Sequence, residues 1–95
     1  MSSDFMRRLT EYPLEVQAIP EHVIWRLTKN GRFAEARMRM VPWGERSRPE
    51  FRMWVQHATL AFQLMFSQVV ATDDELEVLA RQQRQLFEAK GWAEA

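Results

Sequence analysis

The chain contains no cysteine, so it forms no disulfide, holds no metal through thiolates and uses no thiol nucleophile. Glycine and proline are scarce, with 3 and 4 residues, and apolar residues make up 46% of the chain, which excludes collagen-like and disordered classes. The densest apolar run, Leu60–Phe66, is far shorter than the roughly 18 residues of a membrane-spanning helix. Asp4 stands where a signal peptide carries positive charge. We therefore expect the 95 residues to form one cytoplasmic domain.

A net charge is also lacking, because 13 basic residues balance 13 acidic ones. The balance is uneven along the chain: residues 22–52 carry eight basic and three acidic side chains, whereas residues 1–21 and 53–95 are net acidic. A basic segment between acidic ends is compatible with a polyanion-binding site. The interpretation that we favour is internal pairing, here of a basic sheet with an acidic helix.

A β-hairpin is the clearest local feature. Asn30-Gly31 lies between two strand-like runs and favours a two-residue type I′ turn, in which both central residues have positive φ. The turn fixes the register, so Arg26 faces Glu35 as a cross-strand ion pair, and Ile24 faces Arg37. One face of the hairpin is then wholly apolar and the other mostly charged. The apolar face consists of Val23, Trp25, Leu27, Ala34, Ala36, Met38 and Met40.

The second strand is predicted to end at Pro42–Gly44, because proline and glycine interrupt sheets. The polar stretch Glu45–Pro49 is interpreted as a loop. A third strand follows over Phe51–Gln56, in which apolar and polar residues alternate.

Residues 57–70 admit two interpretations. An apolar stripe at helical spacing favours a helix, whereas the alternation within residues 59–66 favours a strand. We prefer the strand, joined to the third one by a loop over Gln56–Thr59 that sets Val55 opposite Leu60.

A C-terminal helix is predicted over residues 72–91. Thr72 and Glu75 form a capping box, and acidic residues in the first turn suit the positive end of the helix dipole. Gly91 fits the left-handed C′ position of a Schellman motif, which lets Trp92 pack back on the last turn.

These elements define an α+β domain over residues 1–95. Residues 1–20 form an N-terminal arm with a short helix, residues 21–70 an antiparallel meander of three or four strands, and residues 72–91 a helix that packs on the sheet.

Several short strings resemble a group of small bacterial proteins of unassigned function that have a sheet meander followed by a helix ending in Lys-Gly-Trp. The resemblance covers residues 22–92 and implies this fold, but it implies no activity, ligand or catalytic residue. The chain departs from the pattern at Glu45–Pro49, which looks like an insertion, and at Gln56–Thr59, where a glycine turn is expected. The strings are Trp25-x-Leu27-x-x-Asn30-Gly31-Arg32, Ala34-Glu35-Ala36-Arg37, Pro42-x-Gly44, Phe51-Arg52, Glu75-Leu76-Glu77 and Glu88-Ala89-Lys90-Gly91-Trp92.

The sequence indicates no catalytic constellation. His22 and His57 are the only imidazoles, and neither has a carboxylate three or four residues later. The serines lack a nucleophile-elbow context, and Asp73 and Asp74 suit dipole compensation in the first helical turn. We therefore predict a protein without enzymatic activity, cofactor or metal.

The candidate functional surface is the sheet face opposite the main core, which carries aromatic and apolar side chains among arginines. Three hypotheses account for it. An N-terminal helix covers it through Phe5, Leu9 and Tyr12; a second copy or another protein binds it; or it binds single-stranded nucleic acid by stacking bases between arginines. We expect self-association or an unidentified protein partner before nucleic acid, and no membrane. This arginine–aromatic face consists of Ile24, Arg26, Phe33, Arg37, Arg39, Arg52, Trp54 and Met65.

Overall fold

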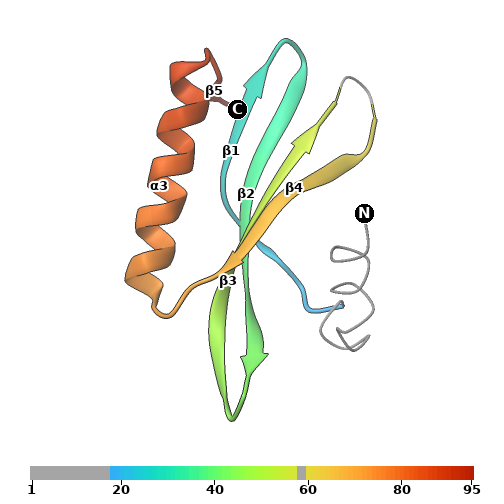
Figure 1. Cartoon of the computed structure of the whole chain (residues 1–95). Coiled ribbons are helices and arrows are strands. Elements are labelled where there is room, and N and C mark those ends of the chain that lie inside the picture. The colour runs from blue at the N-terminus through green and yellow to red at the C-terminus, as the bar shows by residue number, and fades with distance from the viewer. Residues whose placement is uncertain (1–17, 58–59) are drawn as a thin grey trace, which may run out of the picture.

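The computed structural model describes residues 18–57 and 60–95, which form one antiparallel sheet with a helix on one face (Figure 1). The α+β class is thereby confirmed, but the sheet has five strands and not three or four. Their order is β4-β3-β2-β1-β5. The predicted N-terminal helix lies outside the described residues. The elements are β1 His22–Lys29, β2 Arg32–Trp43, β3 Arg46–Gln56, β4 Phe62–Val69, α3 Asp73–Ala89 and β5 Ala93–Glu94.

The first hairpin forms about the predicted turn. Asn30 has φ 53° and Gly31 has φ 75°, as a type I′ turn requires, and the register is confirmed from Lys29 opposite Arg32 to Trp25 opposite Ala36. Beyond Trp25 the prediction is wrong. Ile24 is the extra residue of a β-bulge, so Arg37 pairs with Val23 and not with Ile24. The bulge leaves Val23 55% exposed instead of pointing into the core.

The prediction of a loop over Glu45–Pro49 is wrong, because these residues belong to a second hairpin. Gly44 has φ 62° while Glu45 keeps negative φ, and this combination is typical of a type II′ turn. Strand β3 therefore begins at Arg46, directly opposite Trp43. In Figure 1 the tip of this hairpin projects beyond the neighbouring strands.

The predicted fourth strand exists, but it spans Phe62–Val69 and not residues 59–66, and its predicted register is wrong. Val55 pairs with Gln63 and not with Leu60. Two physical reasons account for the shift: the β3–β4 connection is longer than a four-residue loop, and Met65 is the extra residue of a bulge. The observed pairs include Met53 with Phe66, Trp54 with Leu64 and Arg52 with Ser67.

Both predicted ends of α3 are confirmed. The Thr72 hydroxyl accepts a hydrogen bond from the Glu75 amide at 3.2 Å, as a capping box requires. The Glu75 carboxylate accepts from the Ala71 amide at 2.9 Å and not from the Thr72 amide, so the predicted capping box is formed in part. At the other end, Gly91 has φ 93°, and the Trp92 amide donates to the Phe87 carbonyl oxygen at 3.2 Å, which is the Schellman bond.

The chain after this cap makes a strand that the sequence did not predict. Gly91 reverses its direction, and β5 pairs Ala93 with Thr28 and Glu94 with Leu27. The Lys29 ammonium group donates to the carbonyl oxygen of Lys90, so the first hairpin also closes the C-terminal end of α3.

The hydrophobic core lies between the sheet and α3. Trp25 links the two layers, because its indole N–H donates to the Ala80 carbonyl oxygen at 3.0 Å and its ring meets the Phe87 ring edge-on at 6.0 Å. Met40, predicted to point inward, is 45% exposed. No helix in the described ranges is long and apolar enough to span a lipid bilayer. The buried apolar residues of the core are Trp25, Leu27, Ala34, Ala36, Phe51, Met53, Val55, Val70, Leu76, Ala80 and Trp92.

Candidate interaction surface

The structure brings together only part of the predicted arginine–aromatic face. Arg26, Phe33, Arg37, Arg52 and Trp54 belong to two linked clusters of side chains on β1, β2 and β3. The other three predicted residues are placed differently. Ile24 lies in the β1 bulge, Met65 lies in the β4 bulge, and Arg39 is buried.

Glu35 organises the first cluster, which we call the Glu35 cluster. Its carboxylate lies 3.1 Å from Nε of Arg26 and 2.7 Å from Nη2 of Arg37. The Arg26–Glu35 pair is the cross-strand contact that the hairpin register predicts. Since Glu35 is buried and the two guanidinium groups share it, both arginines are held in fixed positions on the sheet.

Aromatic rings complete the Glu35 cluster. The Arg26 guanidinium lies 4.0 Å from the centroid of the Phe33 ring. The Arg37 guanidinium lies 5.0 Å from the Trp54 ring and 5.3 Å from the Phe62 ring. Such cation–π contacts contribute about 0.5–1 kcal/mol each at exposed sites. Phe62 was missed by the sequence analysis, because the predicted β4 register placed it on the core face.

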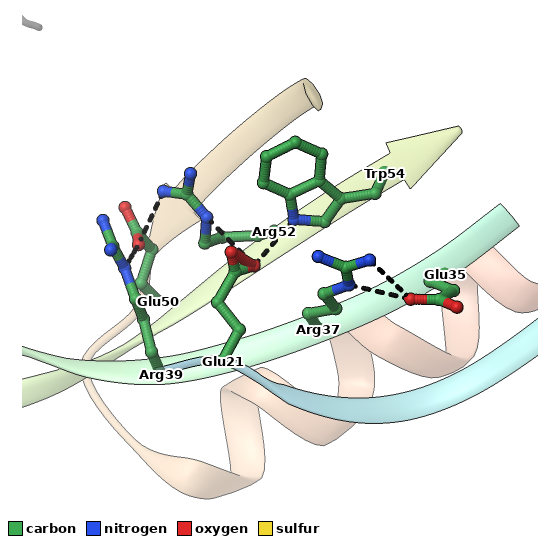
Figure 2. A network of polar contacts seen from close by, with 7 residues as sticks. All are labelled: Glu21, Glu35, Arg37, Arg39, Glu50, Arg52 and Trp54. Atoms are coloured by element: carbon green, nitrogen blue, oxygen red, sulfur yellow. Dashed lines mark hydrogen bonds and ion pairs between the residues drawn. The ribbon is translucent and has the colours of Figure 1, made fainter. Parts of the chain in front are cut away.

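Glu50 organises the second cluster, the Glu50 cluster, shown beside Arg37 and Glu35 in Figure 2. Its carboxylate accepts from Nε of Arg39 at 2.6 Å and from Nη1 of Arg52 at 3.1 Å. The Arg39 and Glu50 side chains are only 5% and 3% exposed. Arg39 therefore belongs to a buried ion pair, and its side chain is not part of an accessible surface.

Glu21, just before β1, connects the Glu50 cluster to Trp54. Its carboxylate accepts from the Trp54 indole N–H at 2.7 Å and lies 3.3 Å from Nε of Arg52 (Figure 2). The Arg52 contact is an ion pair without hydrogen-bond geometry, and its Nε is buried. Sequence reasoning missed both Glu21 and Glu50. The alternation of β3 could have identified Glu50 as a neighbour of Arg52 if the strand had been extended back to Arg46.

Arg26, Arg37, Arg39 and Arg52 of the basic segment thus form ion pairs within the protein, and their carboxylates come mainly from the sheet itself. Glu35 and Glu50 lie on β2 and β3, whereas we expected an acidic helix to supply the partners. On α3, Arg84 lies 3.3 Å from Glu88 and 3.8 Å from Glu94 of β5. In residues 18–57 and 60–95, no three histidine, aspartate or glutamate side chains gather closely enough to hold a metal ion.

Comparison with family models, with curated proteins and with solved structures finds no match to this chain. The resemblance to small bacterial meander proteins therefore stays a prediction from the sequence.

Proposed function

We propose that this chain is a non-catalytic protein-interaction module that binds another protein chain through the exposed part of the Glu35 cluster. The observation that carries the proposal is the placement of Arg37, which Glu35 holds beside the Trp54 and Phe62 rings. Arginine and tryptophan are the residue types that most often supply the binding energy of protein interfaces. Because the salt bridge already fixes Arg37, binding costs little side-chain entropy there.

We propose a non-catalytic role because the carboxylates of this face accept hydrogen bonds from neighbouring side chains. Glu35 and Glu50 accept from guanidinium groups, and Glu21 accepts from the Trp54 indole. At least one oxygen of each of these carboxylates accepts from a neighbouring side chain, which favours a structural role for them. The cytoplasmic location expected from the sequence stays a prediction.

The alternative, binding of single-stranded nucleic acid, has less support from the same contacts. Bases stack on free aromatic faces, but guanidinium groups already lie over the rings of Phe33 and Trp54. Phosphates bind free guanidinium groups, but Arg26 and Arg37 are paired with Glu35.

Site-specific photo-crosslinking in the cells that make the protein tests the proposal. A photoreactive amino acid at Phe33 is expected to form an adduct with a protein, and Arg37→Ala in the same chain is expected to abolish it. The matched control carries the photoreactive residue at Arg81, on an exposed part of α3, and is expected to form no such adduct. If Phe33 gives no protein adduct, or one that persists in the Arg37→Ala chain, the proposal is wrong.

Titration of a fluorescent single-stranded oligonucleotide at about 50 mM salt tests the alternative, because phosphate contacts are strongest at low salt. We expect no change in anisotropy. Tight binding that weakens steeply with added salt and is lost in the Arg37→Ala variant would favour the nucleic-acid hypothesis instead.

A further inference from the structure

The two edges of the sheet differ in how well they are protected against pairing with another strand. On one side, β5 is only two residues long and carries Glu94, which lies 3.8 Å from Arg84. Short strands and charges are usual features that prevent edge-to-edge association. On the other side, β4 is eight residues long and contains no charged residue, proline or glycine. Within residues 18–57 and 60–95, β4 pairs only with β3.

Beyond the bulge at Met65, the C-terminal half of β4 is regular, and its main-chain groups alternate in direction. The amide of Val70, directly after the strand, donates to the Pro49 carbonyl oxygen of β3 at 2.9 Å. In an antiparallel ladder every second residue directs its main-chain groups the same way. The N–H and C=O groups of Ser67 and Val69 therefore point away from β3, toward the outer edge of the sheet.

The side chains of this half alternate as well, and one set lies beside α3. The short connection after β4 brings the end of the strand next to the first turns of the helix (Figure 1). Between them lies an open hollow of about 410 Å³, bordered by Gln68 and Val70 on one side and by Val78 and Leu79 of α3 on the other. Val78 is 46% exposed, so the hollow presents apolar surface that a ligand can cover.

Carboxylates border the hollow where α3 begins. Asp74 and Glu75 belong to the first turn of the helix, and both are exposed. No lysine or arginine lines the hollow. Residues 73–77 carry four carboxylates, which outweigh the roughly half positive charge of the helix N-terminus. This rim therefore favours a ligand with a positive charge over one with a negative charge.

We propose that an extended segment of another protein binds here as a sixth strand, antiparallel to β4 and paired with the main chain of Ser67 and Val69. Residues opposite each other on neighbouring strands direct their side chains to the same face. An apolar side chain opposite Gln68 therefore points toward α3 and enters the hollow. Two residues earlier in the segment, a lysine or arginine opposite Val70 pairs with the Asp74 carboxylate.

Each feature of the site selects one property of this partner. Main-chain groups at a sheet edge pair with an extended chain, the hollow favours an apolar side chain, and the acidic rim favours a positive charge. A second β4 lacks that charge, because the stretch from Met53 to Thr72 contains no lysine or arginine. The site goes beyond the proposed function, since it uses no residue of the Glu35 cluster.

An NMR titration of the isotope-labelled full chain tests the proposal. The probe is the capped peptide Thr-Thr-Lys-Thr-Leu-Thr-Thr, in which lysine stands two positions before leucine. We expect saturable shifts of the Ser67 and Val69 amides, with a dissociation constant below about 1 mM. A peptide with glutamate in place of lysine is expected to bind at least about threefold more weakly. A peptide with proline on both sides of leucine loses the N–H groups that face β4 and is expected not to bind.

Matched variants of the protein locate the contact. Val78→Lys places a positive charge in the hollow and is expected to weaken binding of the probe at least about tenfold. Leu86→Lys, at an exposed apolar position of α3 outside the hollow, is the control and binds as the wild type does. Asp74→Asn is expected to weaken binding about threefold, whereas Asp73→Asn, which does not border the hollow, leaves it unchanged.

The proposal is overturned if the probe causes no saturable shift of the Ser67 and Val69 amides, or if Val78→Lys binds it as tightly as the wild type. An unchanged circular dichroism spectrum shows that each variant is folded. Arg37→Ala is expected to leave binding of the probe unchanged. Failure of this experiment and failure of the Phe33 crosslinking experiment are therefore separate results.

Discussion

At the scale of single residues, the most consequential contact is the buried salt bridge between Arg39 and Glu50. Nε of Arg39 lies 2.6 Å from Oε1 of Glu50, and the same oxygen also accepts from Nη1 of Arg52. Buried ion pairs add little net stability compared with apolar residues of the same size, but removing one partner leaves the other charge uncompensated. The stability of the sheet therefore depends strongly on Glu50.

We predict that Glu50→Gln lowers the free energy of unfolding by about 3 kcal/mol, because two guanidinium groups lose the negative charge that compensates them. Urea denaturation monitored by tryptophan fluorescence measures this change. Glu45→Gln, in the exposed turn of the second hairpin, is the matched control and is expected to change the value by less than about 0.5 kcal/mol. Equal midpoints for the two variants would show that the Glu50 cluster does not stabilise the fold.

Residue contacts could be predicted where a tight turn fixes the register close by. The Arg26–Glu35 pair followed from the Asn30-Gly31 turn, four residues away on each strand. The Glu21 contact with Trp54 could not be predicted in this way, because it joins positions 33 residues apart and no local pattern sets that distance.

At the scale of elements, two of the three glycine-dependent features could be predicted, whereas the type II′ turn at Gly44 was missed. The type I′ turn and the Schellman cap formed where the sequence places Asn30-Gly31 and Gly91. The bulges at Ile24 and Met65 were not predictable, because a bulge adds one residue to a strand without changing its composition. The Met65 bulge, together with the longer β3–β4 connection, shifted the β4 register and so moved Phe62 to the face opposite the core.

We predict that Gly91→Ala destabilises the protein by about 1–2 kcal/mol, because φ of 93° is unfavourable for a residue with a Cβ. Steric clash adds little, since the nearest atoms to an added Cβ are 3.6 Å away on the Lys29 side chain. Thermal unfolding measures the loss. Gly91→Asn is expected to cost less, because asparagine tolerates the left-handed region better. If both variants unfold at the same midpoint temperature as the wild type, the Schellman cap does not hold β5 in place.

At the scale of the whole molecule, the sheet separates two kinds of packing. One face carries the apolar core beneath α3, and the other carries the ion pairs of the Glu35 and Glu50 clusters. The alternation of residues along β1, β2 and β3 predicted this separation. It could not predict which strands form the edges of the sheet, because β5 was not predicted.

The proposed function is contact with another protein chain through the exposed part of the Glu35 cluster, in which Arg37 lies beside the Trp54 and Phe62 rings. Photo-crosslinking from Phe33 in the cells that make the protein is the decisive measurement, because an adduct forms only where a bound chain lies next to that ring. We predict a protein adduct from Phe33 in the wild-type background and none in the Arg37→Ala chain. No adduct from Phe33, or an adduct that persists in the Arg37→Ala chain, would show that this surface does not bind a protein.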